Sequence, residues 1–201
     1  GALGAMSQKK VPAGSGESEY VEKRSRFLGH IRHVSSEEEA KAFIASMKKQ
    51  FYDARHNCWC YIIDGGAVRY SDDSEPQGTA GIPMLEVLKR EGVSDVVCVV
   101  TRYFGGVLLG AGGLLRAYTK ACKDALVDAG IEEIIPKTQG EINIPYNLFE
   151  QLKPVLSGNE AKITDTEYSE KITVKFVIPT RNFENLEREI IEASNGRVKV
   201  E

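Results

Sequence analysis

The sequence predicts an α+β protein of two domains, and three observations support this prediction. The chain has 201 residues, enough for one large domain or two small ones with buried cores. Helical spacing and strand-like alternation follow one another over residues 26–130, which predicts a mixed α/β domain. After a connection at 136–138 the pattern restarts in the order β-α-β-β-α-β. We therefore place the first domain at 20–135 and the second at 138–201.

Residues 1–19 are expected to lie outside both domains. The five residues before Met6 resemble the remnant of an expression tag, so they are excluded from the fold. Residues 7–19 are rich in Ser, Gly, Lys and Glu and show no periodicity. This composition predicts a mobile arm.

The elements of the first domain follow from alternation, helical spacing and turn residues. Ser36-x-x-Glu39 is a capping box that begins a helix, and Asp64-Gly65-Gly66 is a turn signal inside a hairpin. In chain order we expect a strand over 26–34, a helix over 36–50, a hairpin of 57–63 and 67–70, a helix from 83 to 92, a strand buried on both faces over 95–101, and a helix over 114–129.

The second domain has the element order of the ferredoxin-like split βαβ arrangement. Its expected elements are a strand over 141–145, a helix over 147–156, strands over 161–166 and 171–178, a helix over 182–193 and a strand over 197–200. Its helices carry no unusual chemistry, so we interpret it as a binding or scaffolding module.

The charge balance argues against a generally basic protein. Lys and Arg number 26 and Asp and Glu 29, a net charge of −3. Residues 1–137 hold 18 basic and 18 acidic groups and residues 138–201 hold 8 and 11, so a site for a polyanion should be local and lie in the first part. No stretch approaches the ~20 apolar residues of a membrane span, and no signal peptide begins the chain, which predicts a cytoplasmic location and no membrane partner.

Cysteine and histidine spacing predicts no metal site. The four cysteines are Cys58, Cys60, Cys98 and Cys122, with no Cys-x-x-Cys pair. We expect buried free thiols, with a metal site formed with His56 as the minor alternative. His30 and His33 lie three apart in a strand, so they point to opposite faces and make a poor metal pair.

A glycine-rich segment between a strand and a helix is the most informative motif. Its glycines are Gly105, Gly106, Gly110, Gly112 and Gly113. A strand before and a helix after such a loop aim backbone N–H groups at an anion, and Arg102 and Arg116 lie at its two ends. We expect a phosphate or nucleic-acid-backbone cradle; the alternative is a tight strand-to-helix connection with Arg116 solvated. There is no Walker motif, which argues against nucleotide hydrolysis of that type.

Two further clusters could carry chemistry. Arg55 and His56 precede the hairpin, where His56 could be a general base, a phosphate ligand or a structural histidine. Asp72, Asp73 and Glu75 could bind a divalent cation or supply acid–base groups. The alternative for these three is a structural loop in which Asp and Ser make Asx-type turns and Thr79 caps the next helix.

Together these segments resemble a known family. Residues 72–81 read D-D-S-E-P-Q-G-T-A-G, similar to the family pattern D-D-G-E-P-x-G-T-A-G, and residues 102–118 resemble R-Y-F-G-G…L-G-x-G-G-L-x-R-A-Y. With Arg55-His56-Asn57-Cys58 ahead of them, the chain resembles bacterial members of the YigZ/IMPACT family. Ser74 stands where the family has Gly, which argues against a need for positive φ at this position.

The resemblance implies more about fold than about chemistry. It implies ribosomal-protein-type topology with a left-handed crossover for the first domain, and a second domain similar to the ferredoxin-like domains of elongation factor G. Eukaryotic relatives act in translational control by binding a partner of a stress-responsive kinase, through an extra domain that this sequence lacks. No established catalytic activity comes with the family.

Three functions remain open from the sequence. The leading one is a non-enzymatic protein that binds RNA, the ribosome or a translation factor, with phosphate contacts, no cofactor and no readout of DNA sequence. The second is an enzyme acting on a phosphorylated or anionic small molecule, with His56, the 72–81 loop and the 102–116 glycine loop around one pocket. The third is a protein-interaction scaffold.

Overall fold

The computed structural model describes residues 9–201, so the expected tag remnant lies outside the described residues. These residues divide into two compact units, Lys9–Ile134 and Ile135–Glu201. Each unit has a hydrophobic core of its own. The α+β class predicted from the sequence is confirmed.

A five-stranded antiparallel sheet forms the centre of the first unit. Its order is β2 (Gly16–Glu22), β3 (Ser25–His33), β6 (Val96–Tyr103), β4 (His56–Ile62) and β5 (Val68–Ser71). Strands β3 and β4 both pair antiparallel with β6, so they run parallel to each other. The crossover between them contains helix α1 (Glu37–Gln50). The Oγ atom of Ser36 accepts the N–H of Glu39, so the predicted helix start is confirmed.

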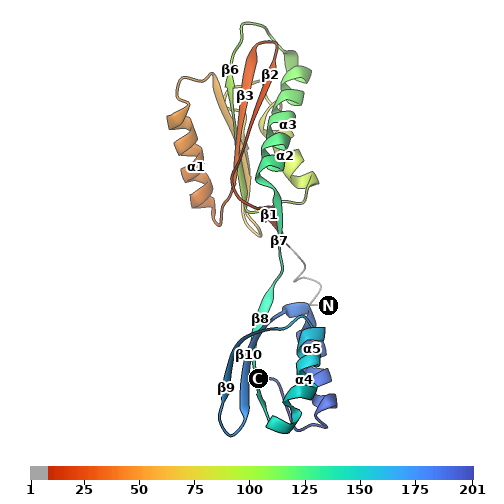
Figure 1. The fold of residues 1–201 in the computed structure, drawn as a ribbon. Helices are drawn as coiled ribbons and strands as arrows, with labels where there is room; N and C mark the ends of the chain where they lie inside the picture. Colours follow the sequence, from red (N-terminus) through yellow and green to blue (C-terminus); the bar gives the residue numbers. More distant parts are fainter. Residues whose placement is uncertain (1–8) are drawn as a thin grey trace. The chain divides into compact units, whose positions relative to one another are not determined.

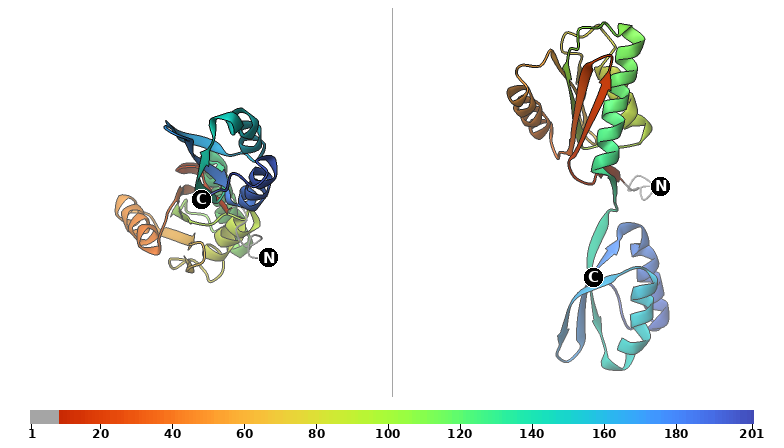
Figure 2. Two further views of the ribbon diagram at one scale, coloured as in Figure 1. Left: turned by 90° about the horizontal axis from the view of Figure 1, so that it is seen from below. Right: turned by 45° about the horizontal axis from the view of Figure 1, so that its top comes forward.

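Helices cover both faces of this sheet. In Figure 1, α1 lies on one side, and α2 (Gly81–Arg90) and α3 (Gly110–Ala129) lie on the other; the right-hand view of Figure 2 shows the same layers. The core under α1 includes Tyr61, Val97 and Val99, whereas Cys60 and Cys98 belong to the core under α2 and α3. Side chains alternate between faces along a strand, so β6 is buried on both sides, as predicted.

The predicted mobile arm is wrong for most of residues 9–19. Strand β1 (Lys9–Pro12) pairs with β7 (Ile131–Ile134), a strand that was not predicted. Strand β2 begins at Gly16 and pairs with β3. Only two of the four positions of β1 and one of the seven of β2 are buried, and both segments are polar and show little alternation in sequence. Lys9 is held by a 2.6 Å ion pair with Asp95.

The second unit has the predicted ferredoxin-like order. Its elements are β8 (Lys137–Ile144), α4 (Tyr146–Gly158), β9 (Lys162–Tyr168), β10 (Ile172–Pro179), a short 3-10 helix (Thr180–Asn182) and α5 (Phe183–Ala193). The antiparallel sheet has the order β8-β10-β9, and both helices pack on one face through an apolar core.

Two boundaries in this unit differ from the prediction. The expected connection at 136–138 is shorter, because β8 already begins at Lys137 and its first residues are polar. The expected strand over 197–200 is reduced to a single bridge between Ile142 and Val200. In the part of the chain that the structure describes, no helix is long and apolar enough to cross a membrane.

Candidate functional site

The sheet register brings the predicted clusters together at one end of the first domain. His56 begins β4 and lies directly opposite Arg102 near the end of β6, and Phe27 on β3 lies opposite Arg102 on the other side. All three side chains lie on the face covered by α2 and α3. The loop that carries Glu75 and the glycine-rich loop before α3 both reach this end of the sheet.

Glu75 is the centre of a buried polar network. It is 7% exposed. Nη1 of Arg102 donates to both carboxylate oxygens at 2.9 Å, and the hydroxyl of Tyr118 donates to Oε2 at 2.6 Å. Nε2 of His56 lies 3.2 Å from Oε1. Burial, together with Cys58 and Glu75, raises the pKa of Tyr118, so its hydroxyl stays a donor. Each oxygen of Glu75 is therefore already contacted twice.

Arg102 is the buried cation that matches this carboxylate. Only 5% of the residue is exposed. The centre of its guanidinium lies 5.6 Å from the ring of Phe27 and 5.5 Å from the ring of Phe104, and Nη2 donates a long bond of 3.4 Å to Oγ of Ser25. Its Nε is buried with no hydrogen-bond partner. A buried donor without a partner is costly, so Nε of Arg102 is a donor that the described chain leaves unsatisfied.

Both ring nitrogens of His56 are engaged. Nδ1 lies 2.7 Å from the carbonyl oxygen of Asp73, which can only accept, so Nδ1 carries a proton. An unprotonated Nε2 would turn its lone pair toward the carboxylate of Glu75. Nε2 can donate to Oε1 of Glu75 only when it also carries a proton. Both nitrogens therefore already face protein oxygens.

Asp72 and Asp73 hold the loop and the start of α2. The carboxylate of Asp72 accepts the N–H groups of Gly78, Ala80 and Gly81 at 2.8 to 3.2 Å. It therefore satisfies the beginning of the helix, a role that the sequence interpretation gave to Thr79; the hydroxyl of Thr79 instead donates to the carbonyl of Pro76.

The neighbouring residues complete this loop. Oδ2 of Asp73 accepts the N–H of Asn57 at 2.7 Å. Ser74 has φ of +69°, so the expectation that this position needs no positive φ is wrong. Asp72 and Asp73 therefore have the structural role that the alternative interpretation of this loop gave them. Glu75 instead belongs to the buried polar network at the end of the sheet.

The glycine loop is fixed at its first residue and open beyond it. A Cβ atom on Gly105 would lie 2.1 Å from the carbonyl carbon of Arg24, so only glycine fits, and its N–H donates to Oγ of Ser25 at 3.2 Å. Gly106 and Gly110 have φ of +89° and +77°. Within residues 9–201, no protein acceptor bonds the N–H groups of residues 106–109. The N-cap of α3 has no side-chain bond, and its first turn has no acidic residue.

A pocket of about 270 Å³ opens where these elements meet. Five of the predicted site residues line it, namely Arg55, His56, Glu75, Arg102 and Gly110. The rest of its wall comes from Pro76, Phe104, Leu108, Leu109, Ala111 and Leu114. The guanidinium of Arg55 lies 4.8 Å from the centre of the Phe104 ring.

The other predicted site residues do not line this pocket. They are Asp72, Asp73, Gly105, Gly106, Gly112, Gly113 and Arg116. Arg116 is exposed, and its Nη1 would lie 3.3 Å from a Cβ atom on Gly112. Arg102 lines the pocket and Arg116 does not, so the lining gives no support to the expectation that these two arginines share one site.

Sequence reasoning missed three residues of the site. Tyr118 and Phe104 lie inside the motif that was singled out, but without a role. Ser25, which contacts both Arg102 and Gly105, lies between two arginines in a segment with no motif. Only the pairing of β3 with β6 brings it to the site, and nothing in the local sequence signals that pairing.

The cysteines are free and buried, as predicted. Cys58 lies behind the site, where its thiol donates to the carbonyl of Asp72 and burial raises its pKa. A hydrogen bond with Cys122 and burial raise the pKa of Cys98. These thiols stay protonated and unreactive. Among residues 9–201, no three His, Cys, Asp or Glu side chains are grouped as a metal site.

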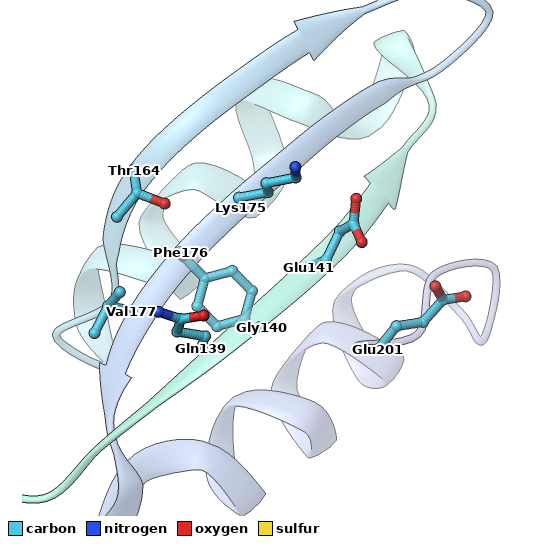
Figure 3. Close-up of a pocket in the computed structure, with 8 residues that line it drawn as sticks. All are labelled: Gln139, Gly140, Glu141, Thr164, Lys175, Phe176, Val177 and Glu201. Carbon is cyan, nitrogen blue, oxygen red and sulfur yellow. The ribbon is translucent and has the colours of Figure 1, made fainter.

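A second depression, of about 470 Å³, lies on the C-terminal domain. Figure 3 shows Glu141 and Lys175 among its lining residues, with Glu201 beside them. Its charges have both signs, and none of these three residues is buried. It lacks the buried charged network that distinguishes the pocket of the first domain.

Comparison with known families divides the chain as the structure does. The Impact N-terminal domain matches residues 23–126, and a domain of unknown function, DUF1949, matches residues 142–197. The first range contains every residue that lines the pocket.

Similar proteins come from bacteria and eukaryotes. IMPACT family member YvyE of Bacillus subtilis is 37% identical over 91% of this chain and 85% of its own length. IMPACT family member YigZ of Escherichia coli is 32% identical over 89% of both chains. Protein IMPACT of mouse is 32% identical over 45% of this chain and 30% of its own length.

A solved structure also matches almost the whole chain. It is the crystal structure of a hypothetical protein, with a TM-score of 0.63, 31% identity and 97% coverage of both chains. The family match to residues 23–126 and the bacterial relatives agree with the resemblance found in the motifs. The chain therefore belongs to the IMPACT family.

Proposed function

We propose that this protein is a non-enzymatic, cytoplasmic binding protein that contacts RNA, the ribosome or a translation factor in translational regulation or a stress response. Its pocket would receive an anionic group of that partner. One observation carries the proposal: the side-chain hydrogen-bonding capacity left over in the pocket belongs to donors. The guanidinium of Arg55 has no hydrogen bond or ion pair within residues 9–201, and Nε of Arg102 has no partner.

The acceptors of the pocket are already used. Arg102, Tyr118 and His56 occupy both oxygens of Glu75, and both nitrogens of His56 face acceptors. Two arginines against one carboxylate leave a net positive charge. The N–H groups of residues 106–109 add further donors beside it. Such a surface favours an anion, and a phosphate group is the anion that RNA presents.

Family membership supports the link to translation. Relatives named IMPACT occur in yeast and mouse as well as in bacteria, and the pocket lies inside the domain that the family shares. The motif resemblance includes eukaryotic relatives in translational control. A general regulatory or translation-related role agrees with both.

Salt dependence of RNA and ribosome binding tests this function. We expect the protein to bind a short oligoribonucleotide and ribosomes more weakly as salt rises, because phosphate contacts release counterions. Arg55→Ala should weaken binding and reduce the slope of log K against log salt by about 1. Fluorescence anisotropy measures binding to the oligoribonucleotide, and cosedimentation measures binding to ribosomes.

Arg32→Ala is the matched control. Arg32 is also exposed and stacks on a ring, that of Phe43, but it does not line the pocket. It should leave the slope unchanged. Binding that does not weaken with salt, or equal effects of the two substitutions, would contradict phosphate contact at this pocket.

An enzyme acting on an anionic small molecule is the second candidate. The convergence of His56, Glu75 and the start of α3 on one pocket favours it. Against it, His56 and Glu75 both have their acid–base atoms engaged, and Asp72 and Asp73 bond backbone N–H groups. Turnover of phosphorylated compounds that disappears in Glu75→Gln, while that variant stays folded, would establish this function instead.

A further inference from the structure

We propose that the pocket binds a terminal phosphomonoester, the phosphorylated end of an RNA chain or a mononucleotide, in preference to an internal phosphodiester. This inference rests on the proposed function and names the part of the RNA that enters. It follows from three properties of the pocket, which are its size, its charge and its apolar wall.

Size is the first restriction. A volume of about 270 Å³ equals about nine water molecules at their share of liquid volume. An internal phosphate carries a ribose on each side, so a continuous strand would have to enter and leave the same small space. A terminal phosphate has only one substituent and can enter first.

Charge is the second restriction. Arg102 is only 5% exposed, lines the pocket and has an Nε without a hydrogen-bond partner. Arg55 also lines the pocket and has no anionic partner within the described chain. Two arginines against the carboxylate of Glu75 leave a net positive charge, and the N–H groups of residues 106–109 add donors beside it. A phosphomonoester carries about −1.5 to −2 near pH 7, whereas a phosphodiester carries a single charge. The monoester presents three acceptor oxygens and more negative charge to these donors, so the pocket should favour it.

The apolar wall is the third property. Phe104, Leu108, Leu109 and Leu114 line the same pocket as the two arginines. Leu108 is 83% exposed, so a bound ligand could cover it. The terminal nucleoside joined to the phosphate would cover this leucine and the Phe104 ring. Inorganic phosphate alone would leave them exposed.

Three oligoribonucleotides of one sequence test the inference, labelled at an internal base. One has a 5′-phosphate, one a 3′-phosphate, and one has hydroxyl groups at both ends. We expect one phosphorylated form to bind about tenfold more tightly than the hydroxyl form, because charge-assisted hydrogen bonds are stronger than those between neutral groups. Arg55→Ala should remove this difference, and Arg32→Ala should retain it.

Competition by AMP and by inorganic phosphate distinguishes the sources of the group. Displacement of the RNA by AMP at a lower concentration than by inorganic phosphate would support contact with the apolar wall. Equal displacement by both would overturn that contact. Equal affinity for all three oligoribonucleotides, with salt-dependent binding intact, would overturn the inference while the proposed function stands. If neither RNA nor ribosomes bind, the RNA- and ribosome-binding function fails, and binding of AMP alone would then support only the phosphomonoester pocket.

Discussion

The two domains stabilise their sheets in different ways. The C-terminal domain packs α4 and α5 on its sheet through aliphatic and aromatic side chains, and its buried polar residues, Asn159 and Ser194, are uncharged. The N-terminal domain buries Glu75, Asp95 and Arg102 in addition to its apolar core. A buried ion pair is weak evidence for stability, because desolvation offsets the attraction between its charges.

We infer that Glu75 and Arg102, two of these three buried charges, serve the pocket. Glu75 and Arg102 both line it, while the depression of the C-terminal domain has only charges that are not buried. A domain of similar architecture class can form a core without such charges, as the C-terminal domain does. We therefore expect the buried charges at the pocket to lower the stability of the N-terminal domain, a cost that the C-terminal domain does not have.

The largest effect is expected at Glu75. Glu75→Ala removes the partner of a cation that stays buried, so it should destabilise the N-terminal domain by about 3–5 kcal/mol. Hydrogen exchange of β6 amides and urea unfolding followed by Trp59, the single tryptophan, measure this loss.

Two variants make this comparison sharper. Glu141→Ala, in the depression of the C-terminal domain, should change the protection of β10 amides by less than about 0.5 kcal/mol. Glu75→Leu combined with Arg102→Met removes both charges and should recover most of the loss, since apolar replacement of a buried pair is neutral or stabilising. A double variant as unstable as Glu75→Ala would show that the pair itself stabilises the fold.

A smaller effect is expected at Asp95, which has a counterpart in the C-terminal domain. Asp95 and Glu160 both have positive φ, +51° and +62°, and both form an ion pair, but only Asp95 is buried. Asp95→Asn should destabilise the N-terminal domain by about 1.5–3 kcal/mol at pH 7, the contribution of hydrogen bonds to charged groups. Glu160→Gln should cost less than about 0.5 kcal/mol.

The effect at Asp95 should also depend on pH. Burial alone would raise the pKa of Asp95, but the hydrogen bonds from Lys9 and from the N–H of Asp64 lower it below its usual value. A carboxyl with a lowered pKa stabilises the fold above its unfolded pKa of about 3.9, and this contribution is lost as pH falls through the folded pKa. The difference between the wild-type protein and Asp95→Asn should therefore be full at pH 7 and shrink below about pH 4. A constant difference in urea unfolding from pH 7 to pH 3 would contradict this.

The sequence predicted the apolar elements well and the polar edges poorly. Buried β6 and capped α1 have patterns that local physics determines, and both were found. Strands β1 and β7 are short, and β7 is exposed along its whole length, so their pairing has no sequence period to reveal it.

The site was predicted as separate clusters for a similar reason. His56 and Arg102 become neighbours only through the register of β4 on β6, which joins residues 46 positions apart. Their motifs indicated residues able to bind an anion or transfer a proton. They did not indicate that Glu75 would contact Nε2 of His56. Ser25 was missed because a single serine between arginines has no local signal.

The smallest effect, of opposite sign, is expected at Ser74 beside the pocket. Its φ of +69° costs a non-glycine residue about 1–2 kcal/mol. Glycine removes this strain but loses about 0.5–1 kcal/mol more backbone entropy on folding. Ser74→Gly should therefore stabilise the N-terminal domain by about 0.5–1 kcal/mol, measured by urea unfolding.

Asn195 is the matched position in the C-terminal domain, with φ of +54°. Asparagine tolerates the left-handed region better than serine, so Asn195→Gly has less strain to relieve and the entropy loss should cancel the gain. A gain in stability from Ser74→Gly without one from Asn195→Gly would show that removable backbone strain lies next to the pocket, close to the buried charges of Glu75 and Arg102. Equal gains at both positions would show that strain of this kind is distributed without regard to the site.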